Sequence, residues 1–169
     1  SLLAFDLVMS LEPHWYSSLF GAYYFVGNLY LAMAALIVMA WLLRGPLGLT
    51  RLIGPRQFRD MGNLLLGFDV LLTGFFFAQY LTIWYGNLPE ETSFLIPRAY
   101  SHPWHHVGFL LLAFCYLGPF LALIWPRVKM NPRLLGPVAL VVMAAMWLER
   151  WDLVMPSLEP HRIAGVWPP

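Results

Sequence analysis

Residues 61–86 read MGNLLLGFDVLLTGFFFAQYLTIWYG, and this stretch decides the fold class. Asp69 is its single charged residue. A helix that spans a bilayer needs about 20 predominantly apolar residues. The stretch is long enough to meet this requirement, so it predicts a transmembrane helix.

The rest of the chain repeats this pattern. Sixty per cent of the 169 residues are hydrophobic and 11% are charged, whereas soluble domains carry about 25% charged residues. Further apolar stretches cover residues 16–43, 104–125 and 134–156. The sequence therefore predicts an all-α integral membrane protein, with about four transmembrane helices that form an up-down bundle.

The charges between these stretches predict an orientation. The connections 44–60 and 126–133 hold seven of the ten basic residues. The positive-inside rule assigns such basic loops to the cytoplasm. Seven of the nine acids and all five histidines fall on the opposite side, in the tail 1–15, the loop 87–103, the tail 157–169 or the adjoining ends of the stretches 104–125 and 134–156. We expect a multi-pass membrane protein with these segments on the outer side.

A repeated sequence lies on that outer side. Residues 5–14 read FDLVMSLEPH and residues 151–161 read WDLVMPSLEPH, so nine residues recur in the same order. The second copy follows a transmembrane stretch as its tail and exit turn, and by analogy the first copy follows a helix that is not in this sequence. This predicts an excerpt of a longer subunit; the alternative is a complete four-helix protein.

The end of the last stretch holds candidate site residues. Glu149 is expected about one turn below the outer interface, where partial desolvation would let it accept a proton near neutral pH. Arg150 could orient a ligand oxygen or hold an acid ionised. Asp152, together with Glu12 and His14 of the first repeat, completes this predicted group of proton-transfer and ligand-binding residues. The alternative is that the group only anchors a helix end.

A second group is predicted along residues 61–86 and beyond. Ionisable residues inside a membrane mark functional sites by default. Asp69, Thr73 and Tyr80 have the spacing of one helix face, so they could carry protons from the inside toward Asn87 and Glu90. The alternative is a buried Asp69 that is neutral or paired.

The sequence gives little reason to expect a redox centre on this chain. Cys115 is a lone cysteine, and iron–sulfur clusters need several thiolates. His102, His105 and His106 cluster near the interface, but no carboxylate or further cysteine completes a ligand set at suitable spacing. We predict no metal site, and no nucleic-acid partner is expected.

Three longer stretches carry a family resemblance. They are FDLVMSLEPHWYSSLFGAYYFVG (5–27), RDMGNLLLGFDVLLTGFFFAQYLTIWYGNLPEET (59–92) and MNPRLLGPVALVVMAAMWLERWDLVMPSL (130–158). They resemble the F subunit of alternative complex III, which is the quinone-binding subunit 2 of a bacterial quinol:cytochrome c oxidoreductase of the polysulfide-reductase type. The resemblance covers the later part of a family chain of about ten helices. Glu149 falls where the family has an acid, whereas Asn63 and Asp69 depart from the family pattern.

The resemblance implies a place in a respiratory electron-transport complex of the bacterial inner membrane, with the outer segments on the periplasmic side. The chain would shape a quinol site, for menaquinol or ubiquinol, or a proton route, and the group around Glu149 would supply the quinol and proton residues. Haem c and iron–sulfur clusters would belong to partner subunits: cytochrome c-type subunits, an iron–sulfur subunit and a related membrane subunit. Two other hypotheses remain: a purely structural subunit of the same complex, and an independent transporter.

Overall fold

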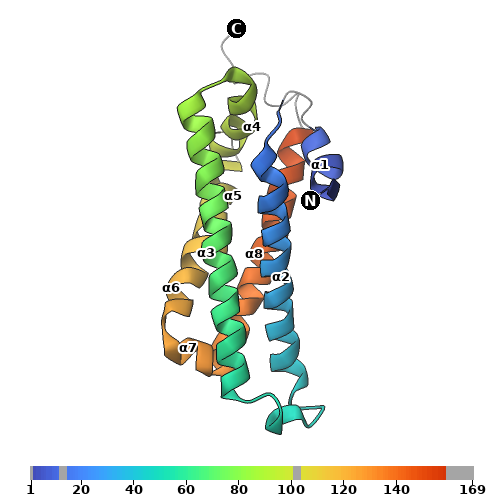
Figure 1. Cartoon of the computed structure of the whole chain (residues 1–169), viewed down its shortest axis with the longest axis vertical. Coiled ribbons are helices and arrows are strands. Elements are labelled where there is room, and N and C mark those ends of the chain that lie inside the picture. The colour runs from blue at the N-terminus through green and yellow to red at the C-terminus, as the bar shows by residue number, and fades with distance from the viewer. Residues whose placement is uncertain (1, 12–14, 101–103, 159–169) are drawn as a thin grey trace.

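The computed structural model describes residues 2–11, 15–100 and 104–158, which form a bundle of long helices (Figure 1). In chain order, the elements before residue 101 are α1 (Leu2–Leu7), a 3₁₀ turn (Met9–Leu11), α2 (Ser18–Leu43), a 3₁₀ turn (Leu49–Arg51), α3 (Pro55–Gly86) and α4 (Pro89–Tyr100). The later elements are α5 (Trp104–Leu111), a π-helical segment (Leu112–Leu117), α6 (Gly118–Ile124), α7 (Pro126–Met130) and α8 (Pro132–Leu158). The described part of the chain has no β-strand, so the predicted all-α class is confirmed.

Three segments among the described residues are long and apolar enough to cross a membrane. They are α2, α3 and the continuous run Trp104–Ile124. The helix α8 is not one of them, although it has 27 residues. Glu149, Arg150 and Asp152 lie near its end and shorten its uninterrupted apolar stretch. The predicted count of four membrane-spanning helices is therefore not confirmed; the described residues supply three.

Local sequence explains where the longest helix begins and ends. Pro55 occupies the first turn of α3, where the absence of an N–H group costs no hydrogen bond. The Gln57 side chain accepts a hydrogen bond of 3.0 Å from the backbone N–H of Gly54. Asn87 ends the helix in the left-handed conformation, with φ of 45°. As a result α3 begins six residues before the predicted stretch 61–86.

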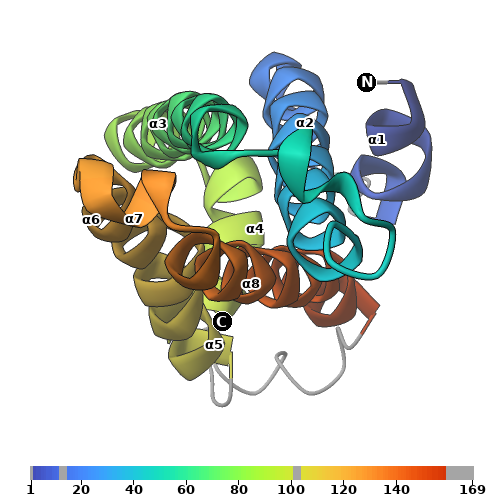
Figure 2. The ribbon, with the colours of Figure 1, turned by 90° about the horizontal axis from the view of Figure 1, so that it is seen from below.

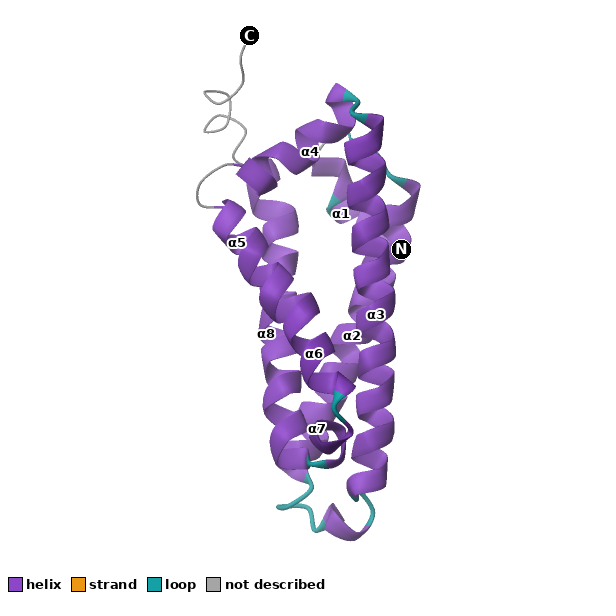
Figure 3. Ribbon diagram, turned by 90° about the vertical axis from the view of Figure 1, so that its left-hand side faces the viewer, coloured by secondary structure: helices purple, strands orange, loops and turns teal. Residues whose placement is uncertain are grey.

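The predicted outer loop 87–103 contains a helix. In Figures 1 and 3, α4 crosses over one end of the bundle between α3 and α5. The connection 44–54 and α7 lie at the other end (Figure 1). The interpretation of residues 87–103 as a loop was wrong, because Pro89 starts the helix α4, in which Phe94 and Arg98 are buried.

The helix α2 packs against both α3 and α8, as the end-on view shows (Figure 2). Its contact with α8 includes Gly27, which has no side chain and thereby leaves room for Arg150 and Met146. The first and last predicted transmembrane stretches are therefore neighbours. The 3₁₀ turn Met9–Leu11 of the first repeat also contacts α8, so this part of the first copy lies near the helix that carries the second.

Candidate functional site

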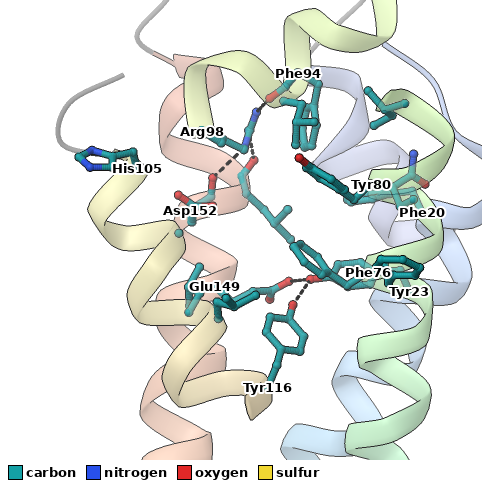
Figure 4. A pocket seen from close by; sticks show the side chains of 18 of the residues that line it. Phe20, Tyr23, Phe76, Tyr80, Phe94, Arg98, His105, Tyr116, Glu149 and Asp152 are labelled. Carbon is teal, nitrogen blue, oxygen red and sulfur yellow. Dashed lines mark hydrogen bonds between the residues drawn. The ribbon is translucent and has the colours of Figure 1, made fainter. Parts of the chain in front are cut away.

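A cavity of about 500 Å³ lies in the half of the bundle that α4 covers (Figure 4). Its walls come from α2, α3, α4, α5 with the π-helical segment, and α8. Most of its lining is aromatic or aliphatic, and its polar groups include two acids. The lining residues with polar side-chain groups are Trp15, Tyr23, Gln79, Tyr80, Arg98, His105, Tyr116, Glu149 and Asp152.

Two acids of α8 belong to one wall of this cavity. Glu149 and Asp152 are three residues apart, so their side chains leave the same helix face about 5–6 Å from each other. Both are buried, at 3% and 9% exposure. Buried carboxylates are rare unless they are paired or functional. The structure thus brings together two of the predicted site residues.

Two tyrosines form the polar floor below Glu149. The Tyr23 hydroxyl of α2 donates a hydrogen bond to Glu149 Oε1. A hydroxyl has one proton to donate, so Tyr116 must be the donor in its own 2.9 Å contact with the Tyr23 oxygen. Figure 4 shows the three side chains converging from three elements. The result is a buried chain of hydrogen bonds that ends on the carboxylate.

Arg150 forms an ion pair with this carboxylate on the side away from the cavity. Its Nη1 lies 3.1 Å from Glu149 Oε2. Its Nη2 faces α2 and donates to the carbonyl oxygen of Tyr24 at 3.4 Å and to Asn28 Oδ1 at 3.3 Å. The guanidinium carbon lies 3.9 Å from the centre of the Tyr24 ring. Arg150 is not among the cavity residues, so it balances the charge of Glu149 rather than touching a ligand.

Arg98 joins the roof of the cavity to the end of α8. Because Pro156 has no N–H group, the Asp152 carbonyl four residues earlier lacks its usual helical donor. Arg98 Nε donates to this carbonyl at 3.2 Å. Its Nη2 donates to the Leu153 carbonyl at 3.0 Å and to Ser157 Oγ at 2.9 Å. One arginine of α4 therefore fixes the helix that bears both acids.

Aromatic rings complete the roof. The rings of Trp15 and Phe94 stack with centroids 3.9 Å apart and planes 9° apart. The guanidinium carbon of Arg98 lies 3.7 Å from the centre of the Phe94 ring. Trp15 Nε1 is buried without a hydrogen-bond partner. The roof therefore contains an aromatic stack and one covered N–H group without a hydrogen-bond partner.

The π-helical segment Leu112–Leu117 explains how Tyr116 reaches the floor. Gly118 donates its N–H to the Ala113 carbonyl five residues earlier, and a Cβ at this position would lie 2.6 Å from that oxygen. Pro119 has no N–H group for the Cys115 carbonyl, which instead accepts a hydrogen bond of 3.3 Å from the Tyr30 hydroxyl. The Gly118-Pro119 pair thus favours a local widening of the helix, which often accompanies functional sites.

Three buried polar atoms of the cavity residues have no hydrogen-bond partner. They are Trp15 Nε1, Glu149 Oε2 and Asp152 Oδ1. Two of them accept and one donates. A buried polar atom without a partner carries a free-energy cost of about 1–3 kcal/mol. All three atoms are covered by neighbouring groups, so a ligand in the cavity would reach them only after a side-chain rotation, and Glu149 Oε2 already pairs with Arg150. The lining therefore suits a flat, largely apolar molecule that has hydroxyl groups.

Only part of the predicted proton path, formed by Asp69, Thr73, Tyr80, Asn87 and Glu90, lies at this site. Tyr80 lines the cavity, whereas Asp69 and Thr73 do not. Asp69 is fully buried, and the Tyr30 hydroxyl is a polar group beside it. Asn87 is exposed and caps α3. The predicted proton path therefore stays a prediction, and of Asp69, Thr73 and Tyr80 only Tyr80 belongs to the cavity.

Other predicted residues lie outside the described parts of the chain. This holds for Glu12, His14 and His102, for the SLEPH portion of the second repeat beyond Leu158, and for the side chain of Glu90. His105 lines the cavity, and its ring lies 3.7 Å from the ring of His106. Among residues 2–11, 15–100 and 104–158, no group of three or more candidate ligands could hold a metal ion.

Sequence reasoning missed Tyr23, Tyr116 and Arg98 as site residues. A signal was present for the tyrosines, because a hydroxyl within an apolar stretch needs a partner. For Arg98 the signal was a lone cation in a segment that otherwise carries acids. None of these signals identifies the partner.

Comparison of the chain with protein-family models found no match, and comparison with curated proteins found none either. The resemblance to alternative complex III therefore stays a prediction. The geometry of the cavity has to support any functional conclusion.

Proposed function

We propose that the cavity binds a membrane quinol and that Glu149 accepts a proton as the quinol is oxidised. The observation that carries this proposal is the pair of buried acids, Glu149 and Asp152, in one wall of a mainly aromatic cavity. A quinol ring is flat and apolar and has two hydroxyl donors. Its hydroxyl groups match the two carboxyl groups of this wall: Asp152 Oδ1 has no hydrogen-bond partner, and Glu149 Oε2 has only its ion pair with Arg150.

The balance of the reaction defines what this chain must do. A quinol that becomes a quinone releases two electrons and two protons. The two acids receive the protons in turn, and Asp152 lies nearer the α4 end, toward which they would leave. The electrons pass to haem c and iron–sulfur centres of partner subunits in a complex of the alternative complex III type. The chain itself supplies binding, orientation and proton transfer.

The groups around Glu149 are suited to a proton acceptor. Arg150 pairs with Oε2 and Tyr23 donates to Oε1, so both oxygens of the carboxylate are held in place, and each keeps a lone pair that can accept a proton. Position matters because general-base catalysis needs the acceptor within hydrogen-bond reach of the proton that it removes. Tyr116 in turn holds Tyr23. The preorganised group therefore favours proton transfer without rearrangement.

A second candidate function is a structural subunit of the same complex. Arg150 supports it, because its contacts with Tyr24 and Asn28 join α8 to α2 whether or not a ligand binds. In that case the buried acids would only stabilise the packing of the helices.

The substitution Glu149→Gln distinguishes these two functions. It keeps the size of the side chain but removes its ability to accept a proton at neutral pH. In the complex purified from native membranes, we expect quinol oxidation to fall at least about a hundredfold, the lower range of the contribution of a general base. Asp60→Asn, at an exposed position near the start of α3, is the matched control and should leave the rate unchanged. Unchanged oxidation by an assembled Glu149→Gln complex would favour the structural function.

A further inference from the structure

The cavity opens to the surface on one side, between α3 and the helical run that begins with α5. Most of its lining residues are buried or half-buried, but five are exposed. These five all belong to α3 or to the run formed by α5 and the π-helical segment: Phe76, Phe77, Tyr80, Phe109 and Leu112. The exposed fractions reach 60% for Phe77 and 67% for Phe109. We name these five residues the side mouth.

The packing of the helices explains this opening. Toward the α7 end, α3 packs against α6 and α7. Toward the α4 end, α5 packs against α8 and α4 instead of closing onto α3. Figure 3 shows α5 and α8 on one side and α3 on the other, with α4 bridging them. The cavity is thus roofed by α4 while its side remains open between α3 and α5.

The residues of the side mouth lie inside their helices rather than at the outer ends. Phe77 is nine residues before the end of α3, which corresponds to about 14 Å at 1.5 Å per residue. Leu112 is eight residues after the start of α5, or about 12 Å. Trp84 and Trp104 lie nearer the helix ends, where interfacial aromatics are usual. The opening therefore faces the apolar layer of a membrane rather than water.

We infer that the side mouth is the place where a long apolar tail leaves the cavity, so that a lipid-soluble quinol enters sideways from the bilayer. This inference rests on the proposed function of the cavity. The head group faces Glu149 and Asp152 on the buried wall, and the tail passes between Phe77 and Phe109 on the exposed wall. All five mouth residues present aromatic or aliphatic surface, which matches a hydrocarbon chain and no charged group.

The substitution Leu112→Trp tests the inference, because it narrows the mouth at a position 40% exposed and far from the acids in sequence. Leu121→Trp is the matched control; Leu121 is exposed on the same helical run but is not a lining residue. Two quinols with the same head group serve as probes, one with a polyisoprenoid tail and one with a methyl group in its place. The enzyme is the complex purified from native membranes.

We expect Leu112→Trp to lower kcat/KM for the tailed quinol about tenfold and to change kcat/KM for the tail-less quinol less than about twofold. Leu121→Trp should change neither. An equal fall for both quinols would mean that the cavity itself is distorted, and no fall for either would mean that the tail leaves elsewhere. Both results overturn the inference.

A second measurement does not depend on a variant. A tailed quinol with a photoreactive group at the first tail unit should label peptides that contain Phe77–Tyr80 or Phe109–Leu112. Labelling confined to α2 or α8 would overturn the inference. Failure of the proposed function looks different: the wild-type complex would then oxidise the tail-less quinol at a rate that Glu149→Gln does not change.

Discussion

The Tyr23 hydroxyl of α2 donates a hydrogen bond to Glu149 of α8, although the two residues are 126 positions apart in the chain. Both side chains are buried, and Tyr116 donates in turn to Tyr23. The contact joins the helix next to the first repeat with the helix that carries the start of the second. It also fixes the carboxylate that we propose as the proton acceptor.

Removal of this hydrogen bond should affect both stability and oxidation. Tyr23→Phe keeps the ring but leaves Glu149 Oε1 without its donor. We expect the free energy of unfolding to fall by about 1–3 kcal/mol, because a buried acceptor loses its partner. Denaturant unfolding in detergent measures this change, and quinol oxidation should also decrease. Tyr85→Phe, at a residue 79% exposed, is the control. Equal stability of the two variants would contradict the contact.

Arg150 should be essential for stability only while Glu149 is charged. Arg150→Met leaves the buried carboxylate without its countercharge, and we expect a loss of about 3 kcal/mol in the free energy of unfolding. The double variant Glu149→Gln with Arg150→Met should recover most of this loss, because neither charge remains. A double-mutant cycle measures the coupling. Additive effects of the two substitutions would show that the ion pair contributes nothing.

Asp69 should destabilise the fold. Its carboxylate is fully buried, and the Tyr30 hydroxyl beside it offsets only part of the cost of burial. Asp69→Asn or Asp69→Leu should therefore raise the free energy of unfolding by about 1–3 kcal/mol. The same variants test the predicted proton path. If Asp69 transfers protons, its removal should lower the number of protons released per quinol. A stability decrease on both substitutions would mean that Asp69 has a partner in the membrane.

Gly118 should be required for the π-helical segment. A Cβ in Gly118→Ala would lie 2.6 Å from the Ala113 carbonyl oxygen. Relief of this overlap has to shift the backbone that carries Tyr116, and we expect a loss of about 1–3 kcal/mol in the free energy of unfolding. Gly67→Ala in α3 is the matched control, since nothing lies within 4 Å of a Cβ there. The control should stabilise the helix by up to about 1 kcal/mol. A stable Gly118→Ala variant would show that the segment tolerates a side chain.

The helix α4 shows where sequence patterns were insufficient. Residues 87–103 contain two acids, three prolines and one histidine, which are typical of a loop, and the apolar residues among them are few. The segment forms a helix because Phe94 stacks on Trp15 and Arg98 reaches carbonyls of α8. These partners lie far away in the sequence. Sequence patterns were also insufficient for the count of membrane-spanning helices, because α8 combines a long apolar stretch with a charged end.

The sequence by itself determined the helical class, the bounds of the long apolar segments to within a few residues and the placement of Glu149 and Asp152 on one helix face. These follow from length, composition and a spacing of three residues. The tertiary structure decided which faces meet. The helices α2 and α8 are apolar on nearly all sides, so no apolar stripe marks the face that turns inward. Only the packing of the helices brought Tyr23, Tyr116 and Glu149 together, because hydrogen bonds across helices depend on their relative rotation.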